Sequence, residues 1–355
     1  MEQNPDIRDK QMIKQTFLRP EDQEVSEISP EISAFCLSED KRLLVIGTAQ
    51  LEANLIVWEI STNLQLAKLI LPNCCIVLQL KIAHDNKHVI IIGLTKDLLQ
   101  VIMIIDYTTQ NVNIFRSIIH SLPYKIKDVA FHPGSTRKFV TCGIQHMCFW
   151  HQSGKNLESQ LGELVIPKSF SNLGGGVYSH DIQNQGKFGL ALVCEDIDLL
   201  SVKQKTQDHD VDNIFVTFLS MGFLTTTILT SGDDGFLYMW ENERIIRRVF
   251  AHEGHIYALA INQKSGVIAT GGMEGIVILW RIQVEQKSNV NQEGGRIKSL
   301  SKLKMIQISK NVDPSQAVKS PEYNVQSICI DYNRIVIGTR DGSIFEQALA
   351  GEQKL

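Results

Sequence analysis

The sequence predicts an all-β protein made of a repeated unit, on three observations. Four tryptophans lie 92, 90 and 40 residues apart, close to two, two and one units of 40–46 residues: Trp58, Trp150, Trp240 and Trp280. Each ends a short run of strand-forming residues, and residues 256–261 and 267–270 add alternating runs separated by turn residues. No stretch keeps a helical period over about 15 residues. A Trp-ending strand every 40–45 residues is typical of a WD-repeat β-propeller.

The units without tryptophan can be found from the same spacing. Residues 101–106 and 197–202 are strand-like runs at the two empty positions, and residues 342–345 form another near the end. Strand endings then fall near residues 58, 105, 150, 201, 240, 280 and 345. Seven four-stranded blades are within the range of closed propellers. We therefore predict one seven-bladed propeller over residues 12–350.

The segments outside the repeat pattern define the rest of the organisation. We expect residues 1–11 to be a disordered N-terminus and residues 351–355 to be a tail. Residues 12–18 are predicted to add the missing outer strand of the last blade and close the ring, which removes an open sheet edge. A polar insertion at about 283–322, rich in Gln, Lys, Ser and Asn, is predicted to be a surface loop in which residues 305–308 can form an edge strand.

Composition narrows the class of protein. Hydrophobic content of 43% and charged content of 21% are those of a soluble globular chain. The net charge of −4 gives no electrostatic case for nucleic acid or membrane partners. No apolar run reaches the ~18–20 residues that span a bilayer. Seven cysteines without a Cys-x-x-Cys motif predict reduced thiols in a cytosolic protein, with no metal and no cofactor.

Polar residues at repeating positions predict buried hydrogen-bonded chains that end at the tryptophans. The repeat ending at Trp280 offers His252, Thr270 and Glu274. The other candidates are Ser231 and Asp234 before Trp240, and His120 and Thr141 before Trp150. Because such positions recur from repeat to repeat, we assign these residues, with Trp58, to structure. No nucleophile motif Gly-x-Ser-x-Gly stands between a strand and a helix, so we predict that the protein is not an enzyme.

A family resemblance becomes specific at residues 124–150. This segment contains Phe-His-Pro, then Thr-Cys-Gly, then His146 and Phe-Trp in the order Phe-His-Pro…Thr-Cys-Gly-x-x-His-x-x-Phe-Trp. Residues 251–256 contain His-Glu-Gly, and residues 336–344 contain Val-Ile-Gly-Thr-Arg-Asp-Gly-Ser-Ile. The chain thereby resembles the echinoderm microtubule-associated protein-like family, or a closely similar ciliary WD-repeat protein, over about residues 31–155 and 213–349. That family has a hydrophobic motif before its first repeat, which residues 1–30 do not show, and continues into a second propeller.

The resemblance implies a non-enzymatic scaffold that binds microtubules or tubulin, or another cytoskeletal protein. It implies a location in the cytoplasm and cytoskeleton, with the cilium and its axoneme as a specific candidate. The alternative is a WD-repeat adaptor that recruits a protein complex without touching tubulin, which the net charge of −4 favours because tubulin is acidic.

Basic residues outside the blade pattern are the predicted contacts with an acidic partner. We favour those of the insertion: Arg296, Lys298, Lys302 and Lys304. Arg244, Arg247 and Arg248 form a second group on a predicted outermost strand. Since side chains alternate along a strand, only one of Arg247 and Arg248 is expected to reach solvent.

Overall fold

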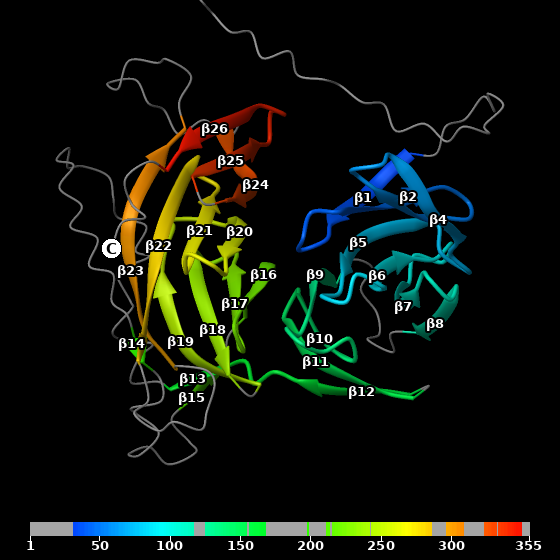
Figure 1. Ribbon diagram of the computed structural model, residues 1–355. Coiled ribbons are helices and arrows are strands. Elements are labelled where there is room, and N and C mark those ends of the chain that lie inside the picture. Colours follow the sequence, from blue (N-terminus) through cyan, green and yellow to red (C-terminus); the bar gives the residue numbers. More distant parts are fainter. Residues whose placement is uncertain are drawn as a thin grey trace, which may run out of the picture.

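The computed structural model describes residues 31–116, 125–154, 156–167, 197–198, 211–213, 215–241, 243–285, 296–308, 323–331 and 333–349. These residues form antiparallel sheets and no α-helix. Five of these sheets make up six blades, because one sheet contains two of them. The blades are named A to F in chain order and succeed one another around a common centre (Figure 1). The predicted all-β propeller is confirmed.

Blades A, B and C each contain four strands that follow one another in the chain. Blade A consists of β1 Glu31–Leu37, β2 Leu43–Ala49, β3 Asn54–Glu59 and β4 Leu64–Ile70. Blade B consists of β5 Ile76–Ile82, β6 His88–Leu94, β7 Gln100–Asp106 and β8 Asn111–Arg116. Blade C consists of β9 Ile126–Phe131, β10 Lys138–Gly143, β11 His146–Ser153 and β12 Asn156–Leu161. A pairing of Ala49 with Ile76 joins blades A and B into one sheet.

Blades D and E repeat this arrangement, and blade F has three described strands. Blade D consists of β16 Phe218–Leu224, β17 Thr227–Gly232, β18 Phe236–Glu241 and β19 Arg244–Phe250. Blade E consists of β20 Ile256–Asn262, β21 Val267–Gly272, β22 Ile276–Glu285 and β23 Arg296–Gln307. Blade F consists of β24 Val325–Ile330, β25 Arg334–Thr339 and β26 Ile344–Ala348.

Tight turns between the strands use residues that tolerate a left-handed backbone. Gly235, in the turn between β17 and β18, has φ of 83°, and a Cβ there would lie 2.0 Å from the carbonyl oxygen of His252. Asn86, between β5 and β6, has φ of 56°. Glycine and asparagine enter this region at low cost, so these turns bring successive strands back into register.

Adjacent blades are held together by apolar side chains that face each other across the sheets. One core cluster joins blades A and B, and the next joins blades B and C. Further clusters join blade C to D, D to E, and E to F. None of the clusters in the described residues joins blade F to blade A. Apolar burial between sheets therefore fixes the order of blades over most of the ring.

The direct contact between blades C and D corrects one sequence prediction. A blade ending near residue 201 was predicted between them, but β9 and β16 pack together: the backbone N–H of Met221 donates to Asp128 Oδ2 at 3.0 Å. The described part of the predicted run is β14 Ile197–Asp198, which pairs with Arg248 and Arg247 on the open edge of β19. Two more short strands, β13 Val165–Pro167 and β15 Val211–Asn213, pair with each other. The outer edge of β19 presents unpaired backbone N–H and C=O groups, and β14 pairs with this edge.

The predicted insertion is a second correction. Residues 283–285 and 296–307 lie in β22 and β23, which pair over ten positions from Ile276↔Gln307 to Glu285↔Arg296. The polar composition predicted a loop. The two segments nevertheless contain the strand-forming apolar residues Ile282, Val284, Leu300 and Ile306, which favour a long hairpin. Residues 1–11, 12–18 and 351–355 lie outside the described residues, so their predicted roles stay predictions.

Candidate functional site

The predicted hydrogen-bonded chain of blade E is present in full. The indole Nε1–H of Trp280 donates to Thr270 Oγ1 at 3.0 Å, and His252 Nε2 lies 2.8 Å from the same oxygen. The other ring nitrogen of His252 contacts Glu274. Thr270 and Trp280 are fully buried, and His252 is 2% exposed. These side chains bond to one another inside the blade, and of their polar atoms Glu274 Oε2 is buried without a hydrogen-bond partner in the described part of the chain. We assign the chain to packing.

Blade C uses a different histidine from the predicted one. Trp150 Nε1 donates to Thr141 Oγ1 at 2.8 Å, and His146 Nε2 lies 2.8 Å from this oxygen. Burial lowers the pKa of His146 to about 4, with a smaller effect from Lys125, so the ring is neutral at pH 7. His120 lies outside the described residues. His146 was missed because the sequence prediction took His120 as the histidine of this chain.

In blade D, the hydrogen-bond partner of the tryptophan is Thr230, the residue before the predicted Ser231. Trp240 Nε1 donates to Thr230 Oγ1 at 2.9 Å, whereas Ser231 Oγ donates to the carbonyl of Ser220. Neighbouring residues on a strand point to opposite faces, so only Thr230 shares the face of Trp240. Asp234 accepts a hydrogen bond from Tyr238 Oη, and burial raises its pKa. In blade A, Trp58 is 5% exposed.

The predicted contact residues of the insertion lie on the outer strand of blade E. Lys302 and Lys304 pair with Trp280 and Leu279 across β22 and β23, and both are half-buried. Arg296 and Lys298 lie on the same strand. The predicted position of these four residues in a surface loop is therefore wrong.

The second basic group contacts side chains of blade D and Glu163, which follows β12 of blade C. Arg244 Nε forms an ion pair with Glu163 Oε1 at 3.0 Å. Arg247 is 7% exposed, and the guanidinium of Arg248 lies 5.0 Å from the ring centre of Phe236. As expected for alternating side chains, the two arginines differ in burial. Because these arginines are paired or at least partly buried, their charges are poorly placed to contact an acidic partner protein.

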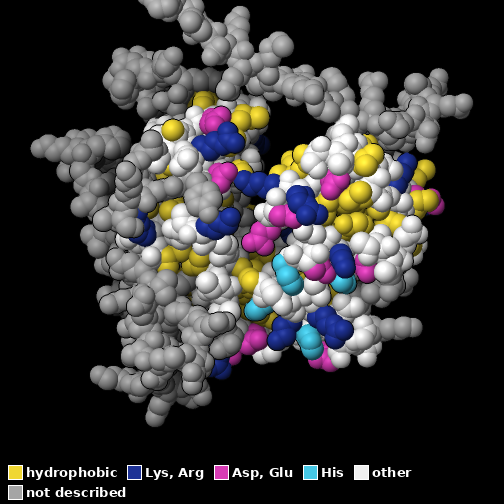
Figure 2. Space-filling model, in the orientation of Figure 1, with side chains coloured by type: hydrophobic (Ala, Val, Ile, Leu, Met, Phe, Trp, Pro, Cys, Tyr) yellow, Lys and Arg dark blue, Asp and Glu magenta, His cyan; other side chains and the backbone are white. Residues whose placement is uncertain are grey.

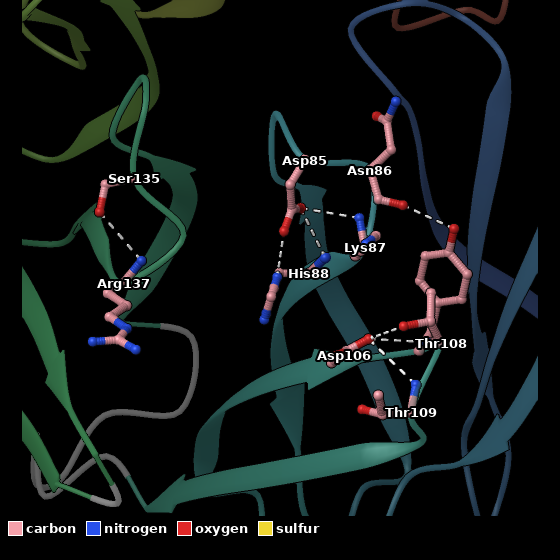
Figure 3. A network of polar contacts seen from close by, with 10 residues as sticks. Asp85, Asn86, Lys87, His88, Asp106, Thr108, Thr109, Ser135 and Arg137 are labelled. Carbon is pink, nitrogen blue, oxygen red and sulfur yellow. Dashed lines mark hydrogen bonds and ion pairs between the residues drawn. The ribbon is translucent and has the colours of Figure 1, made fainter.

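A polar surface at the turns of blades B and C was not predicted from the sequence. Figure 2 shows Lys, Arg and His side chains gathered over the lower part of the half formed by blades A to C, together with acidic side chains. In the β5–β6 turn, Asp85 accepts from the backbone N–H groups of Lys87 at 3.0 Å and His88 at 3.1 Å. His88 Nδ1 lies 2.5 Å from the other carboxylate oxygen of Asp85 (Figure 3).

The acidic side chains of this surface are occupied by the turns themselves. Burial tends to raise the pKa of Asp85, but hydrogen bonds from Lys87 and His88 lower it below its usual range. The Thr108 hydroxyl donates to Asp106 at 2.6 Å and is the main cause that lowers the pKa of Asp106 to about 2. Both carboxylates thus stay ionised, and their lone pairs are directed into the turns.

The basic side chains at the same turns have no such partners. Lys87, Arg137 and Lys138 are exposed, and none forms an ion pair with a described carboxylate. Figure 3 places Arg137 across from Asp85 and His88, on the neighbouring blade. We name Lys87, Arg137 and Lys138 the cationic turn edge. Exposed unpaired cations can attract an acidic surface, but they offer no nucleophile with an adjacent base.

Comparison with known proteins agrees with this geometry. The family model "WD domain, G-beta repeat" matches residues 244–281, which include His252, Thr270 and Trp280 of blade E. The chain carries a WD repeat. Among solved structures, this WD-repeat chain is similar to the β-propeller domain of Cps50 (Swd1) from Myceliophteria thermophila, with a TM-score of 0.57 and 10% identity over 92% of this chain and 88% of that one. At that identity, the likeness concerns the fold alone.

Two sequence relatives are named as echinoderm microtubule-associated proteins or proteins like them. The WD-repeat chain is 25% identical over 177 residues to the 77 kDa echinoderm microtubule-associated protein of Lytechinus variegatus, covering 48% of this chain and 20% of that protein. It is 25% identical over 155 residues to echinoderm microtubule-associated protein-like 2 of Rattus norvegicus, covering 42% and 17%. The matched part spans about a fifth of the length of these relatives.

Two further findings concern chemistry and location. The described residues contain no group of three or more His, Cys, Asp or Glu side chains that could hold a metal ion. In the same part of the chain, no helix has the length and apolar character needed to cross a membrane.

Proposed function

We propose that this WD-repeat protein is a non-enzymatic scaffold that binds microtubules through tubulin. The proposal rests on its similarity to proteins named for association with microtubules. It assigns the protein to the cytoplasm and cytoskeleton, with the axoneme of the cilium as a specific candidate site.

The cationic turn edge is the surface that we assign to the acidic partner. Lys87, Arg137 and Lys138 are exposed and lack ion-pair partners in the described residues. The residues first predicted, Arg296, Lys298, Lys302 and Lys304, remain a second surface, but the half-burial of Lys302 and Lys304 reduces their reach. Opposite charges speed the encounter of two proteins, and salt weakens that attraction.

Co-sedimentation with taxol-stabilised microtubules tests the proposal. The wild-type chain is expected to pellet with microtubules at low salt and less so as salt rises. A variant with Lys87→Ser, Arg137→Ser and Lys138→Ser should bind about tenfold more weakly, as expected when complementary charge is removed. The matched variant with Arg296→Ser, Lys298→Ser, Lys302→Ser and Lys304→Ser should bind like the wild type. The opposite result would move the contact to β23.

An adaptor that recruits other proteins without touching tubulin is the second candidate. The net charge of −4 favours it, because two negatively charged partners repel each other at long range. If the wild-type chain stays in the supernatant at low salt, the result contradicts microtubule binding and favours the adaptor.

A further inference from the structure

A cavity of about 720 Å³ lies between the outer halves of blades C and D. Its apolar floor is formed by Val140 and Phe149 from blade C and by Ile228 and Trp240 from blade D. Its size falls within the range of about 300–1,000 Å³ typical of ligand sites. The cavity adjoins the proposed microtubule contact and shares Lys138 with it, whereas Lys87 and Arg137 do not line the cavity.

The cavity marks incomplete packing at one blade junction. In blades A, D and E, the residue before the tryptophan is buried: Val57 is 0% exposed, Met239 0% and Leu279 1%. Phe149 holds the equivalent position in blade C, yet it is only partly buried and lines the cavity. Blade D buries Val140 of blade C but covers Phe149 only in part. An apolar side chain from another molecule can supply the missing contact.

The rim of the cavity is acidic. Glu158 comes from β12, and Glu241 and Glu243 come from the end of β18 and the turn that follows. Lys138 is the one Lys or Arg among the lining residues. His151 Nδ1 lies 3.9 Å from Glu158 Oε2. A cationic group at the mouth would therefore meet an excess of carboxylates around an apolar floor.

The outer strand of blade C supplies a backbone surface beside this rim. Within the described residues β12 pairs on one side only, with β11. Glu158, Ser159 and Gln160 of β12 all line the cavity and are exposed. An extended peptide can add to such an edge through main-chain hydrogen bonds, while every second side chain points the same way.

We propose that this cavity binds an extended segment of a partner protein that carries one large apolar side chain with Lys or Arg two residues to either side. The segment pairs with β12, its apolar side chain rests on the partly exposed ring of Phe149 at the cavity mouth, and its cations meet Glu158, Glu241 and Glu243.

Three acetylated and amidated pentapeptides test this on the full chain by calorimetry: Arg-Thr-Leu-Thr-Arg, Arg-Thr-Ser-Thr-Arg and Glu-Thr-Leu-Thr-Glu. The first is expected to bind and to shift the methyl NMR signal of Met147, which packs in the same core cluster as Trp240. The other two should bind at least tenfold more weakly. Equal binding of the first two peptides would reduce the effect to surface charge and overturn the proposal, as would no binding of the first.

Two variants locate the site. Glu158→Gln, Glu241→Gln and Glu243→Gln together should weaken the first peptide about tenfold, whereas Glu31→Gln, Glu39→Gln and Glu52→Gln, all exposed on blade A, should not. Val140→Phe should fill the cavity and abolish binding. Because Val140 is 3% exposed, that variant can fail to fold, and the rim variant then decides. Unchanged affinity in the rim variant would place the peptide elsewhere and overturn the proposal.

Discussion

Lys41 and Asp331 are 290 positions apart in the sequence, and their side chains form an ion pair at 3.0 Å that joins blade A to blade F. Lys41 lies in the β1–β2 turn, and Asp331 directly follows β24. Their side chains are 63% and 39% exposed. No core cluster of the described residues spans this junction, so the pair is a polar link at the one place where apolar packing between neighbouring blades is absent from those clusters.

We predict that this ion pair contributes little to stability. Lys41→Ala should lower the free energy of unfolding by less than about 1 kcal/mol, because exposed pairs gain little in water. Urea unfolding followed by tryptophan fluorescence measures the change. Arg334→Ala breaks a pair with Glu346 inside blade F at similar exposure and serves as the control. A loss above about 2 kcal/mol for Lys41→Ala alone would mean that the pair holds the ring together.

The threonines beneath the tryptophans should differ in their contribution to stability. Thr270→Val removes the partner of both Trp280 and His252, whereas Thr230→Val removes that of Trp240. Each buried group left without a partner costs about 1–3 kcal/mol. Thr270→Val should therefore destabilise the protein more than Thr230→Val, by about 1 kcal/mol or more in urea unfolding. If both variants lose the same free energy of unfolding, Thr270 does not stabilise both Trp280 and His252.

These networks show how far the sequence determines the structure. The Trp-ending strands and the chain of His252, Thr270, Glu274 and Trp280 follow from residue type and spacing alone. The choice of Thr230 over Ser231 does not, since it depends on which face of β17 meets Trp240. A shift of one residue reverses the face, and composition does not report it.

The candidate surfaces were harder to predict for a related reason. Lys302 and Lys304 lie in a segment whose polar composition is typical of a loop, yet they pair with Trp280 and Leu279 of β22. The cationic turn edge combines Lys87 from one blade with Arg137 and Lys138 from the next. Residues about 50 positions apart become neighbours only through the packing of whole blades, which no local pattern encodes.

Stability should depend on pH through His146. Burial lowers its folded-state pKa to about 4, against about 6.5 for an unfolded chain. The folded state therefore binds fewer protons, so this contribution is fully present above pH 6.5 and is lost as pH falls toward 4. The loss amounts to about 3 kcal/mol over that window. The pKa of Asp106 is lowered to about 2, so this carboxylate changes stability only below about pH 4, outside the pH window of His146.

Urea unfolding at pH 4.5, 5.5 and 7 measures this dependence. His146→Asn should flatten the change between pH 7 and 4.5, because the variant lacks the group that must gain a proton. His151→Asn, where the side chain is 50% exposed, should keep the wild-type slope. If the free energy of unfolding of His146→Asn changes with pH as in the wild type, another group causes the loss of stability at acid pH.

The predicted closing strand, residues 12–18, gives the last test. Blade F has three described strands, and β26 pairs with β25 alone. Exposed apolar residues lie on both sides of the junction: Ile344 is 77% exposed on β26, and Phe35 is 69% exposed on β1. An unpaired edge beside apolar residues promotes association between chains. Covering this junction with residues 12–18 would satisfy both the strand edge and the apolar side chains.

Two truncations separate the closing strand from the residues before it. Deleting residues 1–11 should leave the midpoint of thermal unfolding and the monomeric state unchanged. Deleting residues 1–18 should lower the midpoint by several degrees, since about 1 kcal/mol corresponds to roughly 2–4 °C in a large domain, and should cause aggregation in size-exclusion chromatography. If both truncated chains unfold at the wild-type midpoint and stay monomeric, residues 12–18 do not close the ring, and the edge of β26 is tolerated as it stands.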